Sequence, residues 1–140
     1  MSMHTAMDIL ASGNYTCVVI KNGLTLMASD KKGVLPLVEF LLHYPDMKGC
    51  ILADRVIGKA AALLCIKAKF LHVHARVMSQ PAAAVLKHHG IHYDYDMMVN
   101  AIQNRQHTGL CPMESLSDGV EDPDLMFRKA SEWLRSKHLL

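Results

Sequence analysis

The chain has little of what marks several large protein classes. Aromatic residues make up only 6% of its 140 residues, too few for a surface that stacks nucleic-acid bases. Lys and Arg number 15 and Asp and Glu 13, so a formal charge of +2 gives no basic field for a nucleic-acid polymer. Charged residues are scarce at 20% beside 51% apolar residues, which excludes a disordered linker protein and indicates one packed domain.

Signals for export, membrane insertion and disulfide bonding are missing as well. The first ten residues carry no Lys or Arg and no long apolar run, unlike a secretory signal. The longest apolar stretch, residues 60–66, is far too short to span a bilayer. The four cysteines form no C-x-x-C pair, and three of them sit in apolar runs where a thiol behaves as a small hydrophobe. We therefore expect a cytoplasmic protein with reduced thiols and no membrane contact.

Strand and helix patterns follow one another along most of the chain. Helical spacing covers residues 3–11 and 35–43, and two β-rich runs, 15–21 and 24–29, flank Asn22-Gly23, a strong hairpin signal. Both faces of this hairpin are apolar, so we expect cover on both sides. Strands at 50–53, 71–78 and 91–98 then alternate with helices that start at Asp54 and Ser79. This order predicts a three-layer α/β/α sandwich whose mixed sheet begins with an antiparallel hairpin.

The chain changes character after residue 115. Residues 1–115 are predicted to form the domain, and residues 116–140 a polar linker followed by an amphipathic helix. Asp122-Pro123 suits a helix start, and Met126, Ala130 and Leu134 form an apolar stripe. We expect this helix to dock on its own domain or on a second subunit of a homo-oligomer.

The most informative segment is the junction around Asp54. As a helix N-cap, Asp54 would accept N–H bonds of the first turn, and Gly58 would allow close helix packing. Arg55 and Lys59 would lie four residues apart on that turn, where each cation opposes the helix dipole by roughly 0.3–1 kcal/mol. A bound anion would compensate them. The alternatives are exposure to solvent or pairing with Asp30, Asp94 or Asp96.

Three further groups of residues offer chemistry. Ser79 begins the next helix, and capping is favoured over a place in the ligand crevice. Cys111, before Pro112, would be a thiol at a helix start, with Glu114 as a capping residue or a general base, although a turn with a buried thiol explains the same pattern. His72 and His74 form an H-x-H pair without a third ligand at a known spacing, so we expect neither a metal nor a cofactor.

Several segments together resemble one small bacterial family of unknown function. They are residues 33–37, 53–62, 79–82, 104–105 and 111–114, and the resemblance spans residues 10–114. In that family a Lys usually follows the Asp, where this chain has Arg55. The resemblance implies a cytidine-deaminase-like fold. Zinc deaminases place H/C-x-E and P-C-x-x-C at the two helix starts, but here these read Ala53-Asp54-Arg55 and Ser79-Gln80-Pro81-Ala82, which disfavours zinc-dependent deamination.

We therefore expect a protein that binds an anionic small molecule, nucleotide-like or phosphorylated. The candidate ligand-binding residues are Asp54, Arg55, Gly58, Lys59, Ser79 and Arg105. Cys111 and Glu114 are the candidates if the protein is a metal-independent enzyme. The alternative is a non-catalytic interaction module that forms homo-oligomers through its ten methionines and its C-terminal helix.

Overall fold

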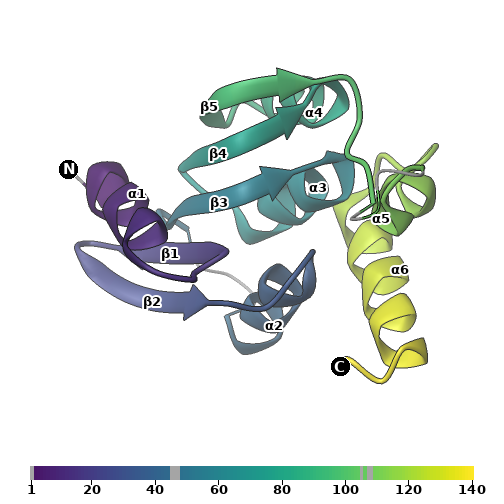
Figure 1. The fold of residues 1–140 in the computed structure, drawn as a ribbon, viewed down its shortest axis with the longest axis horizontal. Coiled ribbons are helices and arrows are strands. Elements are labelled where there is room, and N and C mark those ends of the chain that lie inside the picture. The colour runs from purple at the N-terminus through teal and green to yellow at the C-terminus, as the bar shows by residue number, and fades with distance from the viewer. Residues whose placement is uncertain (1, 45–47, 105, 107–108) are drawn as a thin grey trace.

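One mixed sheet of five strands forms the centre of the protein (Figure 1). The computed structural model describes residues 2–44, 48–104, 106 and 109–140. The strand order is β2-β1-β3-β4-β5. β1 (Cys17–Lys21) pairs antiparallel with β2 (Leu24–Ser29) and with β3 (Ile51–Ile57), whereas β3, β4 (His72–Ser79) and β5 (His92–Val99) run parallel. The predicted hairpin and the parallel crossovers are confirmed.

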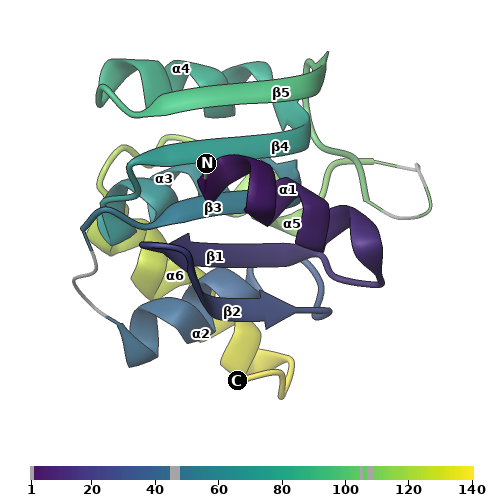
Figure 2. The same cartoon turned by 90° about the vertical axis from the view of Figure 1, so that its left-hand side faces the viewer.

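Helices cover the sheet from both sides, as the predicted sandwich requires. In Figure 2, α1 (Ser2–Ser12) crosses in front of β1 and β3, while the other large helices lie behind the sheet. These are α2 (Leu35–His43), α3 (Lys59–Ala68), α4 (Gln80–His88) and α6 (Pro123–Ser136); a short helix, α5 (Pro112–Leu116), precedes α6. The α/β class is confirmed, and the cytidine-deaminase-like assignment stays a prediction.

The buried apolar residues form two clusters, one on each face of the sheet. The larger one lies between the sheet and α2, α3, α4 and α6. In the smaller one, Ala6 and Leu10 of α1 pack on Val18, Ile20 and Ala53. On this face α1 contacts mainly β1 and β3 and only slightly β4, so no helix in the described part of the chain covers β5 there (Figure 2).

The two strands of the hairpin differ in exposure. Asn22 and Gly23 adopt positive φ angles, which is what the Asn-Gly turn was expected to require. The first four residues of β1 are fully buried, but β2 is an edge strand and Leu24 is 69% exposed. The prediction that both faces of the whole hairpin are covered is therefore wrong for β2, because α1 packs mainly on β1 and β3 and does not extend over this edge strand.

The C-terminal helix docks on its own domain. Asp122 caps α6 by accepting the N–H of Asp124 at 3.0 Å, as its position before Pro123 predicts. Met126, Ala130 and Leu134 are buried in the larger core, and α6 lies mainly against α3. Among the described residues, no helix is both long and apolar enough to cross a membrane.

Candidate functional site

The alternation of buried and exposed side chains is interrupted at the same level in β3 and β4. In β3 the buried Asp54 is followed by exposed Arg55 and Val56 and then by buried Ile57. Neighbouring β4 repeats the pattern, with exposed Arg76 between buried Ala75 and the partly exposed Val77. The cause in β3 is local: a side-chain oxygen of Asp54, Oδ1, accepts the N–H of Val56 at 3.2 Å. As a result, the two residues after Asp54 and the two after Ala75 are exposed or partly exposed. They lie toward the carboxyl ends of two parallel strands, where ligands usually bind in α/β sheets.

Asp54 does not cap a helix, which corrects the sequence prediction. It lies inside β3 with 6% of its surface exposed, and α3 begins only at Lys59, after Gly58. The strand continues through Val56 and Ile57, which favour an extended backbone, and it ends just before the helix. Arg55 and Lys59 therefore do not share a helix face.

The environment of Asp54 is apolar and holds two thiols. Its carboxyl group lies beside the thiol of Cys17, its partner on β1, and Cys65 of α3 lies near enough to feel its charge. Burial raises the pKa of Asp54 to about 7, although the N–H groups of Val56 and Arg55, the Cys17 thiol and the Arg55 charge act to lower it. Burial and the Asp54 charge raise the pKa of both thiols well above their usual range, so the thiols stay protonated.

Two exposed cations lie side by side at this break. Arg55 sits between the strand pairs Asp54–Ala75 and Val56–Val77, which is the level that Arg76 occupies on β4. A guanidinium nitrogen of Arg55, Nη2, lies 3.4 Å from the carbonyl oxygen of Gly13. Across the described residues, neither arginine forms an ion pair with a carboxylate. Two adjacent like charges without a counterion form a site that attracts an anion.

The start of α3 is occupied by carboxylates of the chain itself. Glu114 Oε2 accepts the N–H of Ile102 at 3.1 Å, and a Cβ added to Gly58 would meet Glu114 Oε1 at 2.6 Å. Lys59 Nζ pairs with Glu121 Oε1 at 3.3 Å. The compensating anions expected for this helix start are therefore Glu114 and Glu121, and they are neither a ligand nor the three aspartates considered from the sequence.

The remaining candidates have structural partners or lie apart. Ser79 is fully buried and its Oγ accepts the N–H of Ala82 at 3.2 Å, so it caps α4, as the sequence favoured. Cys111 is half-buried at the start of α5, in the same short segment as Glu114. Arg105 lies outside the described residues.

A histidine–aspartate cluster lies on the open face of β4 and β5, and the sequence did not predict that these residues come together. Asp94 accepts hydrogen bonds from both His72, at 2.7 Å, and His74, while Asp96 Oδ2 lies 3.8 Å from His74 Nε2. Burial alone would raise the pKa of Asp94, but the hydrogen bonds from His74 and His72 outweigh it and lower that pKa. A signal was present in the sequence: H-x-H lies on β4 and D-x-D on β5, and the parallel register pairs His74 with Asp94. In the described residues, no three His, Cys, Asp or Glu side chains are arranged to hold a metal ion.

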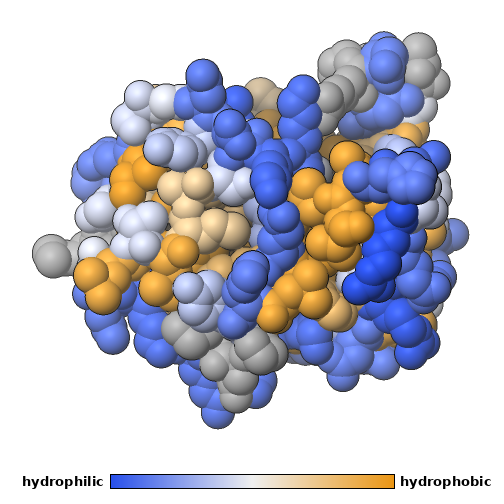
Figure 3. All heavy atoms as spheres, turned by 90° about the horizontal axis from the view of Figure 1, so that it is seen from below, coloured by the Kyte–Doolittle hydropathy of each residue, from blue (hydrophilic) through white to orange (hydrophobic). Residues whose placement is uncertain are grey.

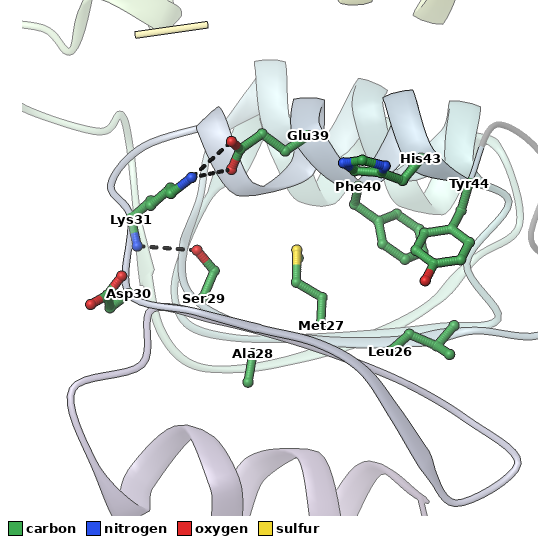
Figure 4. Close-up of a pocket in the computed structure, with 10 residues that line it drawn as sticks. All are labelled: Leu26, Met27, Ala28, Ser29, Asp30, Lys31, Glu39, Phe40, His43 and Tyr44. Carbon is green, nitrogen blue, oxygen red and sulfur yellow. Dashed lines mark hydrogen bonds and ion pairs between the residues drawn. The ribbon is translucent and has the colours of Figure 1, made fainter.

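A hollow of about 530 Å³ lies at the other end of the sheet, between β2 and α2 (Figure 4). Met27 and Phe40 line it, and at one end Lys31 Nζ pairs with Glu39 Oε2 at 2.8 Å. Because this lysine already has a carboxylate partner, the hollow offers less to an anion than the arginine pair on β3 and β4. Seen from the side of α2 and the end of α6, apolar side chains gather in separate areas with a hydrophilic band between them (Figure 3).

Comparison with known proteins gives a family but no activity. The model of the family described as a domain of unknown function (DUF1893) matches residues 5–134. The crystal structure of a DUF1893 family protein from Thermotoga maritima is similar, with a TM-score of 0.87 and 26% sequence identity over 94% of this chain and 88% of that chain. Among curated proteins, none matches.

Proposed function

The chain belongs to the DUF1893 family of domains of unknown function, and from its own site we propose that it binds an anionic small molecule, nucleotide-like or phosphorylated. The binding site would be the carboxyl-end face of β3 and β4, with Arg55 and Arg76 as the groups that hold the phosphate. This keeps the expected class of ligand but moves its position from the start of α3 to the adjacent strands.

One observation supports the proposal most directly: two neighbouring exposed arginines lack a carboxylate partner within the described residues. Side by side, their charges repel one another, and an anion that bridges them turns this repulsion into attraction. The planar guanidinium group also matches the geometry of phosphate oxygens, which it can bind in pairs. Asp96, the carboxylate beyond Arg76 on β5, is directed to His74 instead.

The next level of the sheet suits the apolar part of such a ligand. Val56, Val77 and Met97 are paired across β3, β4 and β5, and Val56 and Met97 are 43% and 59% exposed. An exposed apolar row beside two cations fits a compound that carries a phosphate on an apolar or flat group, and so favours a nucleotide derivative over free phosphate.

Other candidate residues would contribute less directly. Lys59 could assist only by leaving Glu121, and that exchange would cost little because the Glu121 side chain is 80% exposed. Asp54 and Ser79 are buried, and Gly58 lies against Glu114, so none of these three offers a free polar group to a ligand.

A thermal-shift panel tests the proposal. We expect at least one of AMP, ADP, ADP-ribose and pyrophosphate to raise the melting temperature of the wild-type protein, since a ligand that binds only the folded state stabilises it. The double variant Arg55→Ala/Arg76→Ala should lose this shift. The matched control Arg135→Ala, an exposed arginine on α6, should keep it. A wild-type protein that none of these compounds stabilises would contradict the proposal.

A further inference from the structure

Asp54 places a buried carboxyl group directly behind the arginine pair. It precedes Arg55 in β3, lies at the level of Ala75 beside Arg76, and has almost no contact with solvent. We infer that Asp54 regulates the anion site proposed above: it takes up a proton when an anion binds at Arg55 and Arg76. The inference rests on that proposed site, and it adds that ligand binding is accompanied by proton uptake at Asp54.

Asp54 is the group in its cluster that titrates near neutral pH. The groups that act on its carboxyl are Cys17 on β1, Cys65 on α3, and the charge and N–H of Arg55 on β3 itself. Its partner on β4 is Ala75, and α1 contributes apolar Ala6 and Leu10 to the opposite face. Both thiols remain protonated at neutral pH because their pKa values are raised, whereas burial brings the pKa of Asp54 to about 7.

The direction of the coupling follows from the charges. An ionised Asp54 is a negative charge behind the site and repels a bound anion, and protonation of Asp54 removes this repulsion. The site is buried on the side of Asp54, so salt screens this interaction poorly. For charges on the order of 8 Å apart and an effective dielectric constant of about 20–40, the repulsion weakens binding by about six- to thirtyfold.

The hydrogen bond that shapes the strand need not change with the proton. Asp54 Oδ1 accepts the N–H of Val56, and an amide oxygen in the same place can accept it as well. Asp54→Asn therefore mimics the protonated state while it keeps the break in β3. This variant separates the effect of charge from the effect of structure.

ADP-ribose is a suitable probe because its two phosphates are esterified and do not titrate between pH 6 and pH 8. By calorimetric titration, wild-type protein should bind it about five- to tenfold more tightly at pH 6 than at pH 8. Asp54→Asn should bind more tightly than wild type at pH 8, and its affinity should change less between pH 6 and pH 8. Asp118→Asn, which removes an exposed carboxylate, should keep the wild-type slope.

A gain of affinity in Asp54→Asn cannot come from damaged folding, so this result would support the coupling. If the variant keeps the wild-type slope, or binds more weakly at both pH values, the coupling is wrong while the arginine site stands. If wild type binds ADP-ribose at neither pH, the coupling is wrong, and the arginine site falls with it if AMP, ADP and pyrophosphate also fail to bind. Titrations of wild type near pH 7.5 in buffers of different ionisation heat give an independent readout: net proton uptake supports the coupling, and zero or release contradicts it.

Discussion

The buried carboxyl of Asp54 should make the stability of the protein depend on pH in an unusual direction. Its pKa is about 7 in the folded protein and near 3.8 in an exposed chain, so the folded state binds more protons between these values. The favourable contribution is complete below pH 3.8 and is lost as pH rises through 7. The slope is at most 1.36 kcal/mol per pH unit and levels off near pH 7, so the loss between pH 5 and pH 7 is about 2 kcal/mol.

Asp54→Asn removes this dependence because the amide does not ionise. Its N–H₂ group faces the Cys17 side, where a buried donor without a partner costs about 1–3 kcal/mol at every pH. The variant should therefore be less stable than wild type at pH 5 and close to it, or more stable, at pH 8. The lowered pKa of Asp94 contributes only in more acidic solution, where its stabilisation is lost as pH falls.

Urea unfolding at pH 5, 6, 7 and 8, followed through the single tryptophan, Trp133, measures both curves. The free energy of unfolding of wild type relative to Asp54→Asn should fall by about 3 kcal/mol across this range. Parallel curves for the two proteins would refute the assignment of a neutral, buried carboxyl at this position.

Three other substitutions test the packing around the site, each by urea unfolding. Gly58→Ala should destabilise the protein by about 1–3 kcal/mol, because the added Cβ meets the Glu114 carboxylate. The cost should be smaller in a Glu114→Ala background, and equal costs in both backgrounds would refute that contact. Ser79→Ala should cost about 0.5–2 kcal/mol through the lost cap of α4, and no change would contradict the cap. Leu134→Ala should cost about 2–5 kcal/mol, whereas the exposed Leu139→Ala should change stability by less than about 0.5 kcal/mol; similar values would argue against docking of α6.

Much of the fold could be predicted because local patterns and the architecture agree. The Asn22-Gly23 turn, the alternation of strands and helices, and the Asp122 cap each indicate the element that forms there. The error at Asp54 has a clear source. An aspartate before an Ala-rich run is typical of a helix start, but here its oxygen accepts an N–H within the strand, and Val56 and Ile57 continue in extended conformation.

The partners of the charged residues could not be predicted, because they come from segments far apart in the chain. Lys59 meets Glu121 and Gly58 meets Glu114, and no local pattern links these pairs. The adjacency of Arg55 and Arg76 depends on the register of two parallel strands, which their composition does not fix. The partners of Asp94 could not be predicted either. It was considered a possible partner for the two cations, but it accepts hydrogen bonds from His72 and His74.

The central claim is that an anion binds between Arg55 and Arg76, and arginine side-chain NMR tests it most directly. ADP-ribose is titrated into protein labelled with ¹⁵N, and the Nε–H signals of the arginines are assigned by single substitutions. The proposed site predicts that the signals of Arg55 and Arg76 shift together and saturate, while that of Arg135 stays unchanged. Unchanged Nε–H signals of Arg55 and Arg76, with backbone amide shifts confined to the start of α3 or to the hollow beside α2, would contradict it.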